Sequence, residues 1–375
     1  MSIIRQIQAL VLKDIHKGKA IVITGPRRVG KTTLIKSIRE KVKGDTLFLN
    51  CDEPDIRAQL ENVTSTQLKY LMGDNRLLLI DEAQRVKNIG ITLKLIVDNF
   101  PEVQVVASGS SVLELANEIN EPLTGRKRDY MLFPLSISEM TKHDGQLEEK
   151  RLLSQRLVFG LYPDIVNSPE EARESLLELT SSYLYKDILS LNNMRKPALL
   201  EKLLLALALQ VGNEVSFHEL GQITESDPKT VESYISLLEK CFVLFQLGSF
   251  SRNMRNEIKK GRKVYFYDNG VRNAIIKNFN PIELRQDVGA LWENFLVCER
   301  MKANSYNKRY VNSYFWRTRE QQEIDLIEET GGKLYAYEFK WNPKAKGKVP
   351  GSFLRTYPEA TGEVIHRENY MEFVR

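Results

Sequence analysis

One stretch, AIVITGPRRVGKTT at residues 20–33, constrains the fold of this 375-residue chain more than any other. An apolar run precedes the pattern G-x-x-x-x-G-K-[ST], in which Gly25, Gly30, Lys31 and Thr32 hold the fixed places. The residues that follow, TTLIKSIREKV, have a helical pattern. A glycine-rich loop between a buried strand and a helix turns its backbone N–H groups toward a phosphate. The stretch therefore predicts a phosphate-binding loop, with a plain glycine turn as the alternative.

We expect this loop to bind ATP together with Mg²⁺. Lys31 would reach the β- and γ-phosphates and assist catalysis, and Thr32 would ligate the metal. The residues expected to contact the nucleotide or its metal are Gly25, Pro26, Arg27, Arg28, Val29, Gly30, Lys31, Thr32, Thr33, Asp81 and Ser108.

A second apolar run, LLLIDEAQ, ends in Asp81 and Glu82. In phosphate-loop ATPases an Asp at such a strand end joins the Mg²⁺ shell. The next residue, Glu82, would act as a general base on the attacking water; two acids that cap the next helix are the alternative. A third run, VQVVASGSS, ends in Ser108 and Ser110, which are either γ-phosphate sensors or turn formers.

The segment PLTGRKRDYMLFPL contains two candidates for an arginine that stabilises the transition-state charge on the γ-phosphate. Arg126 is the first candidate and Arg128 the second, with a solvated basic turn as the alternative. An arginine that acts on a neighbouring copy would imply a homo-oligomer, and the sequence does not distinguish this from action in its own site.

Composition excludes several classes of protein. The net charge of +5 permits an anionic partner without demanding one. Cys51, Cys241 and Cys298 are scattered with no CxxC pair, which argues against a zinc site or a disulfide framework and suits a reducing compartment. The N-terminus lacks the features of a secretory signal, and the longest apolar run, residues 203–211, is too short to span a bilayer. We expect a cytoplasmic protein without a membrane partner.

Several motifs together resemble one family. GPRRVGKTTL, LLLIDEAQ, SGSS and LTGRKRDYMLFPLSISE look like the AAA-type predicted ATPases of bacteria and archaea that carry an uncharacterised C-terminal region. YLYKDI, YFYDNGVRNAI and LWENFLVCE are similar to the same family, so the resemblance covers nearly the whole chain. The chain departs from it at Leu161, where many members have a second glycine in a Gly-Gly-Tyr-Pro stretch. The resemblance implies binding of Mg-ATP and its hydrolysis.

The stretch SFHELGQITESDPKTVESYISLLEKCFVL has helix–turn–helix form. Pro228 suits the first turn of the second helix, which Asp227 would cap. Two strands follow, so the segment predicts a winged helix that binds DNA; a module for protein contact is the alternative. Four residues at helical spacing would pack inward: Val231, Ile235, Leu238 and Phe242. The side chains expected near DNA phosphates are Lys229, Arg252, Arg255, Lys259, Lys260 and Arg262.

Near the C-terminus, EIDLIEETGGKLYAYEFKW predicts a hairpin with a two-residue Gly331–Gly332 loop. Counting outward from the loop places Asp325 opposite Glu338, and Lys340 shares their face because strand side chains alternate. Two carboxylates that face each other repel and should destabilise a sheet, so their presence here needs an explanation.

This acid–acid–lysine pattern matches the core of the PD-(D/E)xK nuclease-like fold. Asp325 and Glu338 would bind Mg²⁺, Lys340 would steady phosphate charge, and Glu293 on a preceding helix would add a further acid. The alternative is that Lys340 only neutralises the acids in a domain that binds nucleic acid without cutting it.

We therefore predict an α/β protein with four regions. These are a P-loop AAA-type ATPase core with a parallel sheet at 1–135, a helical lid or connector at 136–211, a winged helix at 212–280 and a restriction-endonuclease-like domain at 281–375. The expected function is Mg-dependent ATP hydrolysis coupled to DNA binding, with nuclease activity open. The alternative is a regulatory ATPase whose C-terminal modules bind without cutting.

Overall fold

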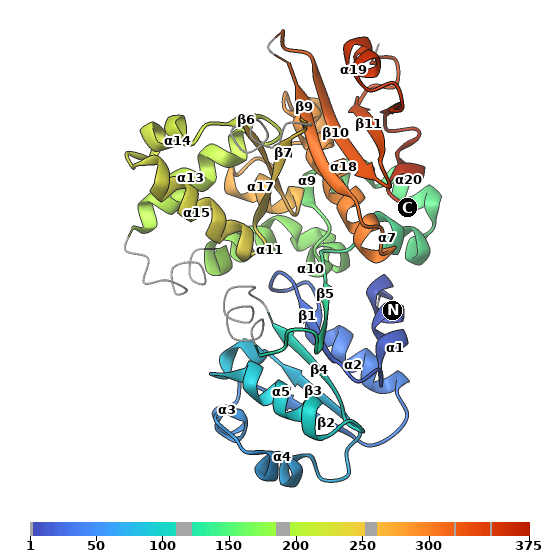
Figure 1. Cartoon of the computed structure of the whole chain (residues 1–375). Helices are drawn as coiled ribbons and strands as arrows, with labels where there is room; N and C mark the ends of the chain where they lie inside the picture. Colours follow the sequence, from blue (N-terminus) through green and yellow to red (C-terminus); the bar gives the residue numbers. More distant parts are fainter. Residues whose placement is uncertain (1–2, 110–121, 185–195, 252–260, 319, 346) are drawn as a thin grey trace. The chain divides into compact units, whose positions relative to one another are not determined.

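The computed structural model describes residues 3–109, 122–184, 196–251, 261–318, 320–345 and 347–375 (Figure 1). It contains two compact units, which are Met1–Pro134 with Lys240–Phe242, and Leu135–Glu239 with Val243–Arg375. The break after Pro134 lies one residue from the first predicted boundary. Among the described residues no helix is long and apolar enough to cross a membrane.

The first unit is built on a five-stranded sheet with the order β2-β3-β4-β1-β5. All neighbouring strands are parallel, which confirms the predicted parallel sheet. Strand β4 separates the strand before the phosphate loop from the strand that ends in Asp81. The strands are β1 Ala20–Thr24, β2 Thr46–Asn50, β3 Leu77–Asp81, β4 Gln104–Gly109 and β5 Lys127–Met131.

Helices cover both faces of this sheet (Figure 1). Alternate strand residues such as Val22, Ile80 and Ala107 form one apolar core with Leu93 and Ile96 of α5. The intervening residues face the other side, because strand side chains alternate, and α2 covers them. The helices are α1 Gln6–Asp14, α2 Lys31–Lys41, α3 Pro54–Leu60, α4 Ser65–Met72 and α5 Ile89–Asn99, with a 3-10 turn η1 at Ala83–Arg85.

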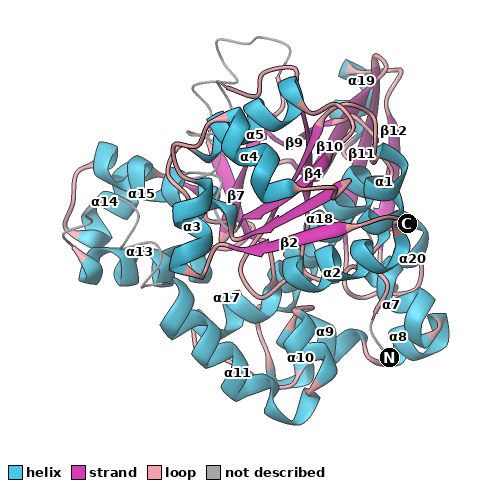
Figure 2. Cartoon of the chain, turned by 90° about the horizontal axis from the view of Figure 1, so that it is seen from below, coloured by secondary structure: helices cyan, strands magenta, loops and turns pink. Residues whose placement is uncertain are grey.

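The second unit is built on a seven-stranded mixed sheet with the order β12-β11-β10-β9-β7-β8-β6. Its strands β9 to β12 run side by side in Figure 2. The strands are β6 Glu214–Val215, β7 Leu244–Ser249, β8 Arg262–Phe266, β9 Asn312–Arg317, β10 Glu323–Thr330, β11 Lys333–Phe339 and β12 Thr361–Ile365.

This sheet crosses the boundary that the sequence suggested at residues 280 and 281. Strand β7 pairs in parallel with β9, with Gly248 opposite Tyr314 and Ser249 opposite Phe315. The strands of the expected winged helix and those of the expected nuclease-like domain therefore form one continuous sheet. The sequence shows the strands but not this pairing, because the partners are more than 60 residues apart.

A long helix, α18, packs against this sheet and carries the buried Trp292. The Trp292 ring stacks on Phe295 at 5.7 Å and meets the edge of Tyr370 at 5.5 Å. The helices are α7 Ile137–Asp144, α8 Gln146–Arg151, α9 Leu153–Phe159, α10 Pro163–Asn167, α11 Ala172–Glu178, α13 Pro197–Leu209, α14 Phe217–Thr224, α15 Pro228–Lys240, α17 Asn269–Ile275, α18 Val288–Tyr306, α19 Gly351–Thr356 and α20 Tyr370–Phe373. Short 3-10 turns are η2 Pro169–Glu171 and η4 Ile282–Leu284, and η3 Leu179–Leu184 is a π-helix.

Candidate functional site

The loop between β1 and α2 depends on its two glycines. Gly25 passes so close to β5 that an added Cβ would lie 2.1 Å from the carbonyl oxygen of Leu132. Gly30 has φ of +91°, in the left-handed region that residues with a side chain rarely adopt. Both glycines of the motif are therefore required by steric contact or backbone conformation.

Lys31 is the first residue of α2, and its ammonium lies within the loop. Nζ donates to the carbonyl oxygens of Gly25 at 2.9 Å and Pro26 at 2.7 Å. Burial lowers the pKa of this ammonium to about 8, and the nearby carboxylates of Glu82 and Asp81 oppose that shift. A cation held against the loop carbonyls is placed to meet a phosphate that enters the loop.

The other expected loop residues differ in exposure. Arg27 is half-buried, whereas Arg28 and Thr33 are exposed. Arg28 also has φ of +58°, which belongs to the tight turn of the loop. Val29 is fully buried, so that only its backbone is available to a ligand.

Two hydroxyls meet on the carboxylate of Asp81, which is buried at the end of β3. Thr32 Oγ1 donates to Asp81 Oδ2 at 2.6 Å, and Ser108 Oγ donates to Asp81 Oδ1. The strand order explains this arrangement, because β4 places Ser108 beside the end of β3. The structure thus brings together Thr32, Asp81 and Ser108 as the sequence suggested. Ser110 lies outside the described residues.

Glu82 follows Asp81 with φ of +52°, a left-handed conformation that turns the chain out of the sheet. Its Oε2 accepts a hydrogen bond of 2.5 Å from Gln84 Nε2. Gln84 was missed by the sequence analysis, although its place in the run DEAQ two residues beyond Glu82 is visible there. This amide holds the expected base in one orientation.

The two candidate arginines lie at the wrong end of the sheet to act on their own loop. The carbonyl of Arg126 accepts from Ala20 N, at the start of β1, whereas the phosphate loop leaves the end of that strand. Four strand residues separate the two ends, which is about 13 Å. Arg126 pairs with Asp98 at 2.6 Å, and Arg128 pairs with Asp14 at 2.9 Å. Neither arginine reaches its own γ-phosphate site in this arrangement.

Arg5, which the sequence analysis did not single out, contacts the phosphate loop directly. Its side chain is buried and donates to the carbonyl of Val29 at 2.7 Å and to that of Phe133 at 2.5 Å. No motif marks Arg5, because its partners lie 24 and 128 residues away.

The hairpin of β10 and β11 has the predicted register, with Thr330 opposite Lys333 across Gly331 and Gly332. Both glycines have positive φ, as a two-residue loop of this kind requires. Continuing the same register places Asp325 opposite Glu338. The two acids have different partners: Asp325 Oδ2 accepts from Phe339 N at 2.7 Å, and Glu338 Oε1 pairs with Lys340 at 2.6 Å.

A buried lysine that the sequence analysis overlooked lies among these acids. Lys263 of β8 is 1% exposed; its Nζ lies 2.8 Å from Glu293 Oε1 and 3.9 Å from Asp325 Oδ1, and it also pairs with Glu323. Burial alone would lower the pKa of Lys263, but the carboxylates of Glu293, Asp325 and Glu323 outweigh it and raise the pKa. The ammonium stays charged and binds the oxygens that a metal would need.

This arrangement differs from the expected metal site at Asp325 and Glu338. Within the described ranges no group of three or more histidine, cysteine, aspartate or glutamate side chains is placed to hold a metal ion. The physical reason is that Lys263 and Lys340 neutralise the acids instead. As arranged, the two ammonium groups occupy carboxylate oxygens that a second Mg²⁺ would take.

Helices α14 and α15 form the expected helix–turn–helix. Asp227 Oδ1 accepts from the backbone N–H groups of Lys229 at 3.0 Å and Thr230 at 2.9 Å, so it caps α15 as predicted. Lys229 is exposed beside this cap, and Arg262 lies with its guanidinium 6.0 Å from the Phe217 ring. The predicted inward residues Val231, Ile235, Leu238 and Phe242 are buried. The remaining predicted phosphate contacts, Arg252, Arg255, Lys259 and Lys260, lie outside the described residues.

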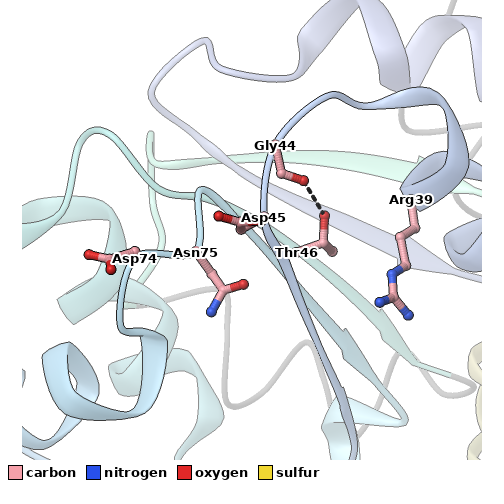
Figure 3. Close-up of a pocket in the computed structure, with 6 residues that line it drawn as sticks. All are labelled: Arg39, Gly44, Asp45, Thr46, Asp74 and Asn75. Atoms are coloured by element: carbon pink, nitrogen blue, oxygen red, sulfur yellow. Dashed lines mark hydrogen bonds between the residues drawn. The ribbon is translucent and has the colours of Figure 1, made fainter.

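A polar surface cavity of about 530 Å³ lies in the first unit, away from the phosphate loop (Figure 3). The residues that line the cavity lie near the N-terminal ends of β2 and β3, whereas the phosphate loop follows the C-terminal end of β1. Thr46 at its centre donates to the carbonyl of Gly44 at 3.4 Å (Figure 3). Because this cavity is at the opposite edge of the sheet, it is no part of the nucleotide site.

Comparisons with known proteins divide the chain in three. Residues 17–141 match the family model of an AAA domain. Residues 150–281 and 288–371 match two domains of unknown function, DUF8612 and DUF4143.

Similar proteins occur in bacteria and archaea. An uncharacterized protein of Mycobacterium tuberculosis is 26% identical over 345 residues, which is 90% of this chain and 73% of the relative. One from Methanocaldococcus jannaschii is 24% identical over 332 residues, covering 76% of this chain and 69% of the relative. Among solved structures, the Walker-type ATPase of Pyrococcus abyssi is similar with a TM-score of 0.50 and 14% identity, covering 73% of this chain and 96% of that chain. Residues 17–141 thus match an AAA domain, and the similarity of fold is to a P-loop ATPase-like structure.

Proposed function

We propose that this domain binds Mg-ATP and hydrolyses it. The observation that carries the proposal is the convergence of three separate segments on one point, where Thr32 and Ser108 both donate to Asp81 beside the ammonium of Lys31. Hydroxyl and carboxylate oxygens are the ligands that Mg²⁺ takes, so the residues present fit the metal.

Each residue then has a defined part in the reaction. Backbone N–H groups of the loop and the start of α2 bind phosphate oxygens, and Lys31 adds a positive charge there. Thr32 and Asp81 would hold the metal, which when bound neutralises charge on the phosphates. Glu82, held by Gln84, accepts the proton of the attacking water.

The test compares ATP binding with ATP turnover in two variants. Lys31→Ala should lose both, because the loop loses its cation. Glu82→Gln keeps the size and the Gln84 contact of the side chain, so it should bind ATP normally while turnover falls by about 10²- to 10⁴-fold. Fluorescent-nucleotide titration gives the affinity and phosphate release gives the rate. Undiminished turnover in Lys31→Ala would refute the nucleotide assignment.

A second function, DNA binding by the second unit, is favoured by the exposed start of α15. The turn before α15 and the strands β7 and β8 after it give the order expected of a winged helix. Lys229 is exposed there, and the basic stretch 252–260 joins β7 to β8. Replacing Lys229, Lys259 and Lys260 with alanine should weaken binding to duplex DNA and flatten its salt dependence. An unchanged salt slope in fluorescence anisotropy would indicate a protein-contact module instead.

We propose further that this unit binds DNA without cutting it. The support is Lys263, whose ammonium binds Glu293 and Glu323 where a catalytic metal would need free oxygens. Plasmid and single-stranded DNA incubated with Mg²⁺ or Mn²⁺, with and without ATP, should stay intact. Cleavage that is lost in both Asp325→Ala and Lys340→Ala, with ATP turnover retained, would establish nuclease activity and overturn this proposal.

A further inference from the structure

Arg5, the buried arginine that contacts the phosphate loop, lies at the start of α1 and is fixed there by the backbone. Gln8 N donates to the carbonyl of Arg5 at 3.1 Å. The same glutamine fastens α1 to α2, because its Nε2 donates to Ser37 Oγ at 2.7 Å and its Oε1 accepts from Lys41 Nζ at 3.1 Å. The base of the Arg5 side chain is therefore held beside the helix that follows the phosphate loop. All of these residues belong to the first unit.

The guanidinium of Arg5 bridges two backbone segments of the same unit. Nη2 donates to the carbonyl of Phe133 at 2.5 Å, and Nη1 donates to the carbonyl of Val29 at 2.7 Å. The Phe133 side is fixed by the sheet, because the preceding residue, Leu132, donates its N–H group to the carbonyl of Thr24 at 2.8 Å and so continues the pairing of β5 with β1. The Val29 side is part of the turn of the loop. Arg5 thus ties the loop to the edge of the sheet through hydrogen bonds from a charged donor, which are stronger than neutral ones.

The bond to Val29 determines where the N–H group of Gly30 points. The two residues share one peptide group, which is planar and trans, so its carbonyl and its N–H point in opposite directions. Because the carbonyl is held by the buried guanidinium, the N–H of Gly30 is directed away from that group, toward the open side of the loop. Gly30 needs such a restraint, since a glycine reaches a φ of +91° easily and leaves it just as easily. Arg5 Nη1 is close enough to provide it, at 3.9 Å from the place of an added Cβ on Gly30.

We propose that Arg5 is a positioning residue for the phosphate site, which holds the Val29–Gly30 peptide so that the N–H of Gly30 faces the phosphates before a nucleotide binds. The proposal rests on the proposed function, because it takes the loop as a nucleotide site. A loop that becomes ordered only on binding loses affinity to conformational entropy, and a loop that is ordered beforehand does not. In this role Arg5 acts through the backbone of the loop, whereas Lys31 meets the phosphates with its own ammonium.

The test uses the whole chain and measures binding separately from turnover. Arg5→Met keeps a long apolar side chain and removes every donor, and Arg5→Lys keeps the charge but replaces two donor nitrogens by one. The matched control is Arg39→Met, which removes a positive charge from an exposed position on α2, beside the polar cavity of Figure 3. Each variant is titrated with a fluorescent ATP analogue, and ATP, ADP and inorganic pyrophosphate are then added as competitors. Phosphate release gives kcat, and circular dichroism shows whether each variant is folded.

Arg5→Met should weaken the binding of ATP, ADP and pyrophosphate by about tenfold or more, the equivalent of one hydrogen bond to a charged group. The three losses should agree within about twofold, because the loop N–H groups face phosphates that all three ligands share. At saturating ATP, kcat should stay within about threefold of the unaltered value, because the lost interaction is the same in the ground state and the transition state. Arg5→Lys should lose about threefold or more in affinity, and Arg39→Met should bind all three ligands as the unaltered protein does.

The outcomes separate this inference from the function on which it rests. If the unaltered protein binds none of the three ligands, both are wrong. If the unaltered protein binds them and Arg5→Met binds them equally well, only the role of Arg5 is overturned; where Arg5→Met does not fold, Arg5→Lys decides in the same way.

Three other results would also overturn the positioning role. A fall in kcat with unchanged affinity would make Arg5 a support of the fold alone. Full affinity in Arg5→Lys would show that the loop requires the charge and not the position of two donors. A loss of affinity confined to ATP would assign Arg5 to the γ-phosphate instead.

Discussion

The substitution Glu293→Gln tests the electrostatics of the buried acid cluster. Glu293 accepts hydrogen bonds from Lys263 at 2.8 Å and from Tyr265 at 2.6 Å, both on Oε1. Glutamine retains an oxygen acceptor at that place and removes only the charge. Lys263 keeps Glu323 and Asp325 as counter-charges, so the variant should fold.

The magnitude follows from the raised pKa of Glu293. Burial and the neighbouring carboxylate of Asp325 raise the pKa to about 7, against 4.5 in its ordinary state, although Lys263 and Tyr265 oppose the shift. Because the folded pKa exceeds the unfolded one, the group stabilises the fold at low pH and that contribution is lost as pH rises through 7. Between about pH 5 and pH 8 the loss amounts to about 2.5 kcal/mol.

Tryptophan fluorescence makes the measurement specific to the second unit. All three tryptophans, Trp292, Trp316 and Trp341, belong to that unit. Urea unfolding at about pH 5 and about pH 8 gives the free energy of unfolding at each pH. The unaltered protein should lose about 2.5 kcal/mol more than the Glu293→Gln variant over this interval.

A matched control uses Glu363→Gln, an exposed glutamate on β12 of the same sheet. It should show the same pH dependence as the unaltered protein. If Glu293→Gln also shows that dependence unchanged, Glu293 does not titrate as the buried cluster requires, and the electrostatic account of Lys263 is wrong.

Three further predictions concern the first unit. Gly25→Ala should weaken ATP binding by about tenfold or more, because the added Cβ would lie 2.1 Å from the Leu132 carbonyl oxygen. The control is Gly289→Ala, whose added Cβ meets open space. Equal ATP affinities of the two variants in titration would contradict the steric argument. The pKa of about 8 for Lys31 predicts that ATP affinity falls about tenfold per pH unit above pH 8, since the neutral amine must regain a proton to bind phosphate. In Lys31→Arg this fall should disappear. A pH-independent ATP affinity in the unaltered protein would refute the prediction. Arg126→Ala should leave turnover of the dilute, monomeric protein unchanged, because Arg126 lies near the start of β1 and pairs with Asp98. A loss of turnover in the monomeric variant would contradict this placement of Arg126.

Local sequence was a good guide wherever function depends on neighbours along the chain. The phosphate loop needs Gly25 for close approach and Gly30 for its φ, and both requirements can be read from a motif of eight residues. The cap of α15 by Asp227 and the register across Gly331–Gly332 are equally local, so they followed from turn and helix chemistry.

Sites built from distant segments were harder to predict. Ser108 reaches Asp81 only because β4 lies beside β3, which the rhythm of strands and helices does not specify. No motif marks Lys263, because its place among Glu293, Glu323 and Asp325 depends on β8 lying near α18 and β10 in the folded unit.

The sequence by itself thus determined the form of the glycine-rich loop in the first unit, and the hairpin turn and the helix cap in the second. Tertiary structure decided which charges meet. In the tertiary structure Arg126 lies at the end of the sheet opposite the phosphate loop. Lysine side chains pair with the acids of the C-terminal hairpin, and Arg5 donates a hydrogen bond to the phosphate loop. The physical reason is that backbone geometry acts over a few residues, whereas the contacts of Lys263 with Glu293 and of Arg5 with Val29 join segments more than 20 residues apart, which only strand order and packing bring together.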